Sequence, residues 1–158
     1  MTTVRCYLPL SGEQLAVLRA ERRLDGPFRA TAVTPEVRAA EPTADEDEHE
    51  YAAAQTAAGW LLGSGAPVLL AAVDVQERDV RLDSGPWVEV GQVDLPRVAA
   101  LHLGDDVITG DPSRLPDEDE GIELSWFDTT ELDHVLELTE RLARTDTTGP
   151  APTRPEEN

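Results

Sequence analysis

Three aspartates that follow apolar segments are the residues of this sequence whose type and spacing could form a chemical site. Asp74, Asp105 and Asp128 each lie close to the end of a predicted strand. If those strands were parallel and adjacent, the three carboxylates would meet at one edge of the sheet. Oxygen ligands of this kind hold Mg²⁺, which usually keeps several waters and binds a substrate phosphate. One hypothesis is therefore a small Mg-dependent phosphohydrolase or phosphotransfer enzyme that uses this aspartate cluster.

A simpler interpretation of the same aspartates is local. Aspartate is common where strands end, and Asp128 with Glu131 three residues later has the spacing of a helix capping box. The carboxylates would then serve separate turns, and no cofactor would be needed. Mg²⁺ remains the alternative.

Two Glu-x-x-His pairs also have metal-ligand spacing, Glu46 with His49 and Glu131 with His134. On a helix this spacing puts both side chains on one face, and carboxylate-bridged di-iron proteins use two such pairs. Those sites lie inside four-helix bundles, whereas this chain is predicted to be about half strand, with both pairs on polar helix faces. The architecture therefore argues against a di-iron site.

The other candidate reactive residues have ordinary explanations. Cys6 is the single cysteine, it lies in an apolar run and no histidine is near it in sequence, so a buried reduced thiol is expected. Residues 63–65 read Gly-Ser-Gly, which is neither a phosphate loop nor a hydrolase elbow. Trp60, Trp87 and Trp126 could anchor an interface, but each lies in a predicted helix or strand and is expected in the core.

The charge of the chain favours some classes of binding partner and disfavours others. It has 158 residues, with 32 acidic residues against 13 basic ones, all arginine, and a formal net charge of -19. Nucleic acids and anionic membranes attract clustered Lys and Arg, and here such a cluster is limited to Arg19, Arg22 and Arg23 on one predicted helix. Nucleic-acid and membrane binding are therefore disfavoured, whereas a basic protein partner would be steered toward this surface.

The negative charge is concentrated in two segments, residues 41–50 and residues 105–120. We expect these acidic segments to form the docking face for a basic partner. The alternative is that they are solvated loops and the first turn of a helix, where carboxylates interact well with the helix dipole. The candidate partner-binding residues are Asp45, Glu46, Asp47, Glu48, Asp117, Glu118, Asp119 and Glu120.

The elements that must position these residues follow from hydrophobic periodicity and breaker residues. Helices are expected from Ser11 to about Leu24, over 35–40, from about 43 to 63 and over about 128–142. Strands are expected at 3–8, 28–33, 67–75, 87–93, 98–103 and 122–127. The pattern predicts an α+β or α/β two-layer sandwich, in which a mixed sheet of five or six strands packs against three or four helices.

The length suits one domain. We expect it to cover residues 1–143, with an acidic mobile loop at 104–121, and we expect a disordered tail at 144–158, where large apolar residues are lacking. Neither a signal peptide nor a run of about 18 apolar residues is found, so a cytoplasmic protein is predicted.

Five stretches of the chain are distinctive in order and spacing: residues 31–38, 45–58, 69–75, 93–103 and 123–132. In these stretches, which span most of residues 3–136, the chain resembles an uncharacterised actinobacterial family of short acidic proteins, a domain of unknown function. The chain departs from the family pattern between Gly104 and Gly121, where the resemblance implies an Ala-rich helix and the sequence has Pro and acids. The resemblance implies a bacterial, cytoplasmic protein and no particular reaction.

These patterns favour a non-catalytic interaction or regulatory protein that binds a basic protein partner. The Mg-dependent enzyme is the alternative, and the two hypotheses differ in whether Asp74, Asp105 and Asp128 lie around one ion. The oligomeric state is left open.

Overall fold

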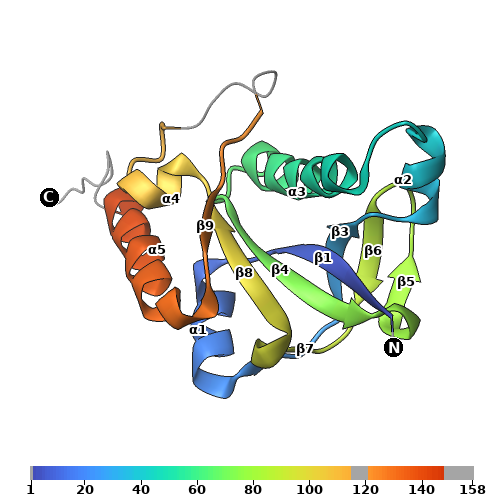
Figure 1. Cartoon of the computed structure of the whole chain (residues 1–158). Coiled ribbons are helices and arrows are strands. Elements are labelled where there is room, and N and C mark those ends of the chain that lie inside the picture. The colour runs from blue at the N-terminus through green and yellow to red at the C-terminus, as the bar shows by residue number, and fades with distance from the viewer. Residues whose placement is uncertain (1, 115–120, 148–158) are drawn as a thin grey trace, which may run out of the picture.

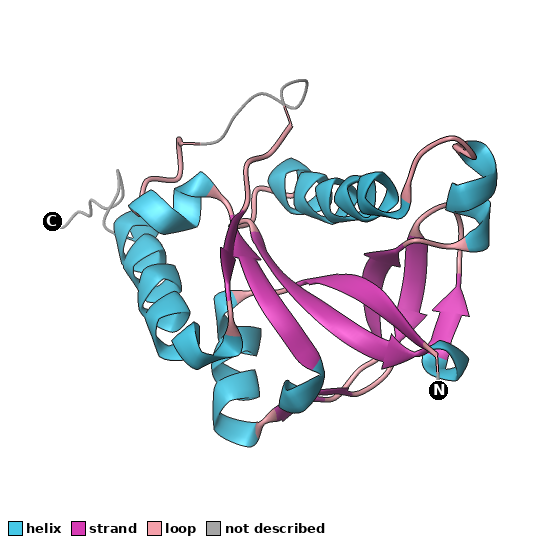
Figure 2. Ribbon diagram, viewed as in Figure 1, coloured by secondary structure: helices cyan, strands magenta, loops and turns pink. Residues whose placement is uncertain are grey.

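The chain forms one seven-stranded antiparallel sheet that carries helices on both faces (Figures 1 and 2). The computed structural model describes residues 2–114 and 121–147. Within this part, the helices are α1 (Gly12–Glu21), α2 (Pro35–Ala40), α3 (Glu46–Gly63), α4 (Asp105–Thr109) and α5 (Leu132–Thr147). The strands are β1 (Thr3–Pro9), β2 (Arg23–Leu24), β3 (Phe28–Ala32), β4 (Leu69–Gln76), β5 (Val80–Leu82), β6 (Trp87–Val90), β7 (Val93–Asp94), β8 (Val98–Leu103) and β9 (Ser125–Phe127).

The strand order of the main sheet is β5-β6-β3-β1-β4-β8-β9, and β2 pairs with β7 in a separate two-stranded sheet. Every described pair is antiparallel. The α+β class is confirmed, but the mixed sheet of five or six strands is wrong. The short strand β5 escaped the sequence analysis because its three residues are too few to show a period, and only their pairing with β6 makes them a strand.

Alternation along the strands divides the core between two faces of the sheet. On β1, Cys6 and Leu8 join the cluster that contains the apolar side chains of α1 and α5. Between them Tyr7 points to the other face, where it packs with Ala54, Ala57 and their neighbours on α3. Because successive strand side chains point to opposite faces, helices cover both sides, as Figure 1 shows. The architecture is therefore three layers instead of the expected two-layer sandwich.

Capping boxes are found at three helix starts, and they confirm the two that were predicted, at Ser11 and at Asp128; the one at Asp45 was not predicted. The side chains of Ser11 and Asp45 each accept a hydrogen bond from the third residue of the helix, whose own side chain returns one, at α1 and α3. Asp128 and Glu131 make the same reciprocal pair at a 3-10 turn, Thr129–Glu131, that leads into α5. The capping spacings in the sequence thus fix where these helices begin.

Two predicted irregular segments begin with helix. The expected loop at 104–121 opens with α4, because Val107 is fully buried and the Asp106 carboxylate accepts a hydrogen bond from the Val68 amide at 3.2 Å. Burial raises the pKa of Asp106 despite that bond. The disordered tail was expected to begin at Arg144, but α5 continues to Thr147, so residues 144–147 are helical. The rest of that tail, and residues 115–120 of the loop, lie outside the described residues.

Candidate functional site

The three aspartates of the hypothetical magnesium site do not come together. β4 is antiparallel to β8 and pairs Leu69 with Leu103, so Asp105 lies at the end of the sheet where β4 begins. Asp74 lies five residues further along β4, on the order of 17 Å away at the usual strand rise. The parallel arrangement on which the hypothesis depended is therefore contradicted.

Each of these aspartates belongs to a separate part of the structure instead. The Asp74 carboxylate accepts hydrogen bonds from the Arg5 guanidinium, with Nε–Oδ1 at 2.7 Å and Nη2–Oδ2 at 3.3 Å. Asp128 caps the 3-10 turn before α5, and Asp105 is the first residue of α4. Among residues 2–114 and 121–147, no group of three His, Cys, Asp or Glu side chains is placed to hold a metal ion.

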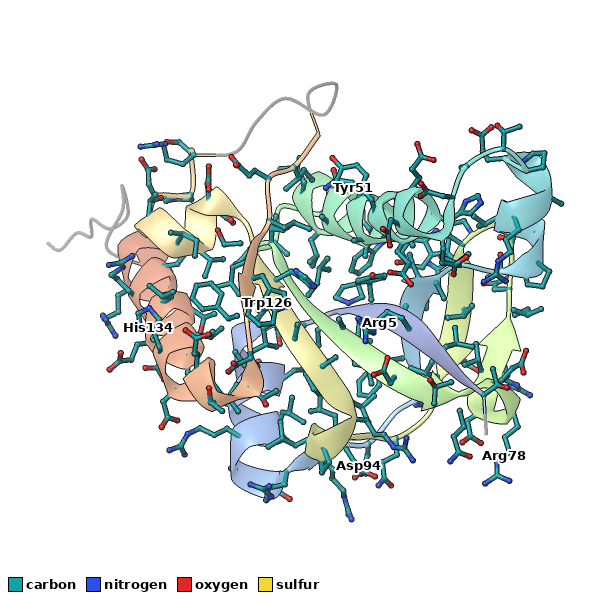
Figure 3. All side chains as sticks on the ribbon, viewed as in Figure 1. Arg5, Tyr51, Arg78, Asp94, Trp126 and His134 are labelled. Atoms are coloured by element: carbon teal, nitrogen blue, oxygen red, sulfur yellow. The ribbon has the colours of Figure 1, made fainter. Side chains whose placement is uncertain are left out.

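The two Glu-x-x-His pairs lie on opposite faces of the sheet, one on α3 and the other across the 3-10 turn and the first residues of α5. Glu46 pairs with Arg38 at 3.0 Å, and His49 is buried at 5% exposure, although a polar helix face was predicted for it. His134 on α5 is exposed and lies 3.9 Å from Glu137 (Figure 3). The shared spacing therefore reflects helical structure and creates no common centre.

Cys6 is a core residue, as predicted. Its side chain is fully buried in the central strand β1, and burial raises the pKa of its thiol to about 12. The thiol is thus protonated at neutral pH and shielded from reagents, the opposite of what a nucleophile needs.

The acidic residues of the first segment, 41–50, have three different roles. Asp45 and Glu48 cap α3, and Glu46 pairs with Arg38. Asp47 and Glu50 line a groove instead. The helix-start explanation therefore accounts for two of the four predicted partner-binding residues in this segment, and the docking hypothesis can rest on Asp47 and the added Glu50. The other four, Asp117, Glu118, Asp119 and Glu120, lie outside the described residues.

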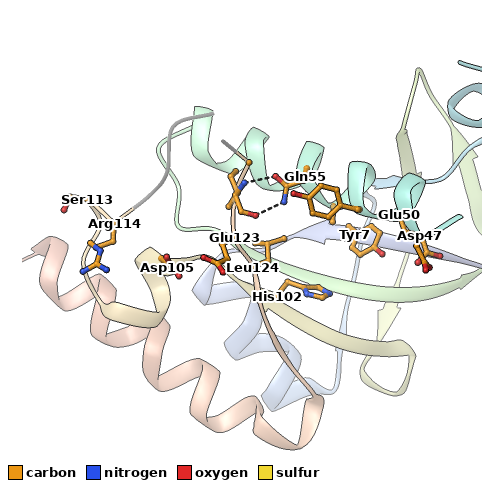
Figure 4. Close-up of a pocket in the computed structure, with 14 residues that line it drawn as sticks. Tyr7, Asp47, Glu50, Gln55, His102, Asp105, Ser113, Arg114, Glu123 and Leu124 are labelled. Carbon is orange, nitrogen blue, oxygen red and sulfur yellow. Dashed lines mark hydrogen bonds between the residues drawn. The ribbon is translucent and has the colours of Figure 1, made fainter. Parts of the chain in front are cut away.

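The groove that these two carboxylates line runs between α3, the end of β8 and the segment at 121–124 (Figure 4). Its volume is about 970 Å³. Tyr7 and His102 lie on its floor, with their rings 6.2 Å apart between centroids. We call it the acidic groove because, besides Arg114, its described charged lining residues are acidic: Asp47, Glu50, Asp105 and Glu123.

Strand register places the two floor residues on the same face of the sheet. Tyr7 pairs with Ala72, and His102 pairs with Leu70, and both Ala72 and Leu70 belong to the core cluster under α3. The helix itself is held down at Thr31, whose buried hydroxyl donates to the Ala53 carbonyl at 2.6 Å. The floor and the α3 wall are thus built on rigid elements.

The opposite wall is attached to α3 by the side chain of Gln55. Its Nε2 donates to the Ile122 carbonyl at 2.7 Å, and its Oε1 accepts from the Ile122 amide at 2.8 Å, as the dashed lines in Figure 4 show. This amide side chain replaces the strand partner that Ile122 would otherwise need. Sequence analysis missed the arrangement because residues 55 and 122 are far apart in the chain and neither belongs to a motif.

The floor of the acidic groove is uncharged at neutral pH. Burial lowers the pKa of His102, and the charge of Arg5 lowers it further. Burial raises the pKa of Tyr7, with a further contribution from the Glu50 carboxylate. Arg5 itself forms an ion pair with Asp74. The result is a pair of neutral rings beneath a rim of carboxylates.

A second groove is apolar and contains two tryptophans. Trp60 on α3 and Trp87 on β6 meet edge to face with ring centroids 6.4 Å apart, in a groove of about 430 Å³ that we call the tryptophan groove. Trp60 is 49% exposed, and Trp126 on β9, elsewhere on the surface, is 61% exposed (Figure 3). The expectation that these tryptophans are core residues is therefore wrong for Trp60 and Trp126.

In the part of the chain that the structure describes, no helix has both the length and the apolar character needed to cross a bilayer.

Comparison with known proteins places the chain in a family. Neither the search of curated proteins nor the search of solved structures found a match. A family model does match residues 4–136, most of the chain, in agreement with the extent of the resemblance. The protein belongs to the family of unknown function DUF6912.

Proposed function

We propose that this protein is a non-catalytic binding protein whose acidic groove takes cationic side chains of a basic partner protein. The observation that carries the proposal is the combination of a carboxylate rim with an aromatic floor in the acidic groove. A rim of this kind attracts a cation, and neutral rings bind it without repelling it.

The electrostatics favour capture of a basic partner in two stages. The net charge of -19 accelerates encounter with a basic surface, an effect that salt screens within about 10 Å at 0.1 M ionic strength. In the groove, each exposed carboxylate–cation pair contributes about 0.2–1 kcal/mol. Several such pairs are needed for useful affinity, and the rim supplies four carboxylates.

Arginine suits the acidic groove better than lysine. A guanidinium is planar, stacks on aromatic faces and donates in a fork that fits a carboxylate, whereas an ammonium is a strongly hydrated point charge. Tyr7 and Tyr51 offer rings, and Asp47 and Glu50 lie on the same wall of the groove as Tyr51. We therefore expect the partner segment to present arginine.

The test uses a defined probe, an acetylated and amidated Gly-Arg-Gly-Arg-Gly-Arg peptide, and its lysine counterpart, titrated by calorimetry at two salt concentrations. The double variant Asp47→Asn/Glu50→Gln should weaken binding of the arginine peptide about tenfold, from two lost charge pairs of about 0.7 kcal/mol each. The control is Glu13→Gln/Glu21→Gln, which changes the net charge equally but lies on α1, on the other face of the sheet.

If both double variants lost the same affinity for the arginine peptide, the binding would come from the net charge of the protein, and a site in the acidic groove would be refuted. Equal affinity for the arginine and lysine peptides would remove the arginine preference. Absence of any peptide binding at low salt would refute the proposal as a whole.

The Mg-dependent enzyme is not supported by the geometry, because its three aspartates lie apart in the antiparallel sheet. A thermal shift on adding Mg²⁺ or Mn²⁺ would revive it, since an ion that binds the folded state stabilises that state.

A further inference from the structure

Strand β9 forms one edge of the main sheet. In the part of the chain that the structure describes, β9 pairs with β8 on one side, from Leu103 with Ser125 to Leu101 with Phe127, and with no strand on the other (Figure 1). Alternate residues of an edge strand direct both the N–H and the C=O away from the sheet. The outer side of β9 therefore presents backbone groups to which a further strand can bond.

The two edges of the main sheet differ in charge. At the opposite edge, the central residue of β5 is Arg81, whose side chain is 80% exposed and pairs with Glu89 at 3.1 Å. A charged side chain on an edge strand opposes the addition of another strand. The residues of β9 are Ser125, Trp126 and Phe127, and none of them is charged. β9 is therefore the edge of this sheet that lacks such protection.

The side chains of β9 place an aromatic ring on each face of the sheet. Trp126 is opposite His102 on β8, so it lies on the same face as the floor of the acidic groove, and it is 61% exposed (Figure 3). Phe127 lies on the other face, half-buried against the core there, with its ring 6.0 Å from the ring of His134. In an added strand, a residue opposite Trp126 would lie beside the indole, and the next residue would lie beside Phe127.

The surroundings of β9 are acidic. Glu123 precedes the strand and is exposed, and Glu131 is exposed shortly after it. Glu137 on α5 lies 3.9 Å from His134, whose ring is close to that of Phe127. These carboxylates attract a basic segment. They also disfavour a second copy of this chain, because two β9 edges in contact would bring together the same carboxylates and two net charges of -19.

The chemistry of the two faces defines the partner segment. A guanidinium that stacks on the Trp126 indole gains a cation–π interaction, which is strongest with tryptophan. On the face of Phe127, an apolar β-branched side chain fits the half-buried surface and favours the extended conformation. A segment in which arginine alternates with valine or isoleucine satisfies both faces.

We propose that β9 accepts an extended segment of a basic partner protein as an additional strand, with arginine beside Trp126 and β-branched residues beside Phe127. In this mode of recognition the main-chain bonds give affinity and the alternate side chains give specificity. Because β9 is only three residues long, the arginine side chains must supply much of the affinity. The proposal does not depend on the acidic groove, because Trp126 is not among the described residues that line that groove.

The test probe is the peptide acetyl-Arg-Val-Arg-Val-Arg-Val-amide, titrated into the full chain at low salt. The main readout is amide hydrogen exchange, measured by NMR at residues 125–127. At saturation, a bound strand should slow the exchange of the outward-facing amides among them about tenfold or more, because no strand bonds these amides in the free protein. The amides of β5, at residues 80–82, are the control, and their exchange should not change.

Two comparisons separate strand pairing from general attraction by charge. The same peptide N-methylated at every residue keeps its guanidinium groups but has no N–H to donate along its backbone, so it should bind about tenfold more weakly. Trp126→Ala should weaken binding of the unmethylated peptide about fivefold through the lost cation–π contact. Trp60→Ala removes another exposed tryptophan, on α3, and should leave the affinity unchanged. Thermal unfolding checks that both variants are folded.

Binding of the peptide without protection at residues 125–127 would overturn the proposal, as would equal affinity of the methylated peptide or no binding up to about 1 mM. Loss of binding in Asp47→Asn/Glu50→Gln without such protection would assign the peptide to the acidic groove, which overturns strand addition and leaves the proposed function standing. Protection at residues 125–127 together with no binding of the Gly-Arg peptide would support strand addition although the acidic groove had failed its own test. A dimer that protects residues 125–127 in the absence of peptide would overturn the proposal by assigning the edge to a second copy.

Discussion

Replacing Gln55 by alanine removes the side chain that hydrogen-bonds the segment at 121–124, one wall of the acidic groove, to α3. Two hydrogen bonds to Ile122 are lost, one at 2.7 Å and one at 2.8 Å. A net contribution of about 0.5–1.5 kcal/mol for each bond gives about 1–3 kcal/mol in total. Because the segment at 121–124 contributes few core side chains besides Ile122, this loss should appear as local opening before it appears as global unfolding.

Amide hydrogen exchange at Ile122 measures this opening directly. The expected loss of about 1–3 kcal/mol corresponds to about 5- to 140-fold faster exchange, because each 1.4 kcal/mol is a factor of ten. Core amides such as those of Ala71 and Leu101 should change much less. Thr56→Ala is the matched control, since its hydroxyl bonds only within α3, to the Ala52 carbonyl.

Gln55→Glu separates the two bonds, because a carboxylate keeps the acceptor for the Ile122 amide and lacks the donor for its carbonyl. It should give an intermediate exchange rate. If Ile122 exchanged at the native rate in Gln55→Ala, or if all core amides accelerated equally, the side chain would not be the local connection described.

Three further predictions concern burial and packing. Cys6 should react with iodoacetamide at neutral pH only as fast as the protein unfolds, because its thiol is buried with a pKa of about 12; rapid labelling of the native protein would contradict this. Gly26→Ala should lower the free energy of unfolding by about 1–3 kcal/mol in urea denaturation, because a Cβ would lie 2.5 Å from the Gly91 carbonyl oxygen. Gly59→Ala is the control: the added Cβ meets open space on α3, and alanine favours the helix, so this variant should raise the free energy of unfolding by about 0.5–1 kcal/mol. The pKa of His102 is lowered in the folded state, so the unfolded state binds more protons. The free energy of unfolding should therefore be highest above about pH 6.5 and should fall as the pH drops through the lowered pKa of His102. In urea unfolding, His102→Gln should lack this part of the pH dependence.

Much of the fold could be predicted from the sequence because its signals are local. The helix start at Ser11 follows from its capping residue, and strand β8 follows from a short apolar run at 98–103. Where local signals were short, the prediction failed: β5 has three residues, and α4 depends on the burial of Val107 and on the bond from Val68 to Asp106.

The candidate site could be predicted only in part. Asp47 was proposed because acidic residues cluster in the sequence, but its role in a groove depends on Tyr7 and His102, which come from two other strands. Nothing in the sequence pairs Gln55 with Ile122 or brings Trp60 to Trp87, since these contacts join segments that are far apart in the chain.

The sequence by itself determined where the longer helices and strands lie, the buried thiol of Cys6 and the surplus of negative charge, because periodicity, capping and composition are properties of neighbouring residues. Only the tertiary structure decided that the sheet is antiparallel, which separates Asp74 from Asp105, and which face each side chain occupies. The physical reason is that strand direction and register are set by pairing between distant segments, and a shift of one residue would move every side chain to the opposite face.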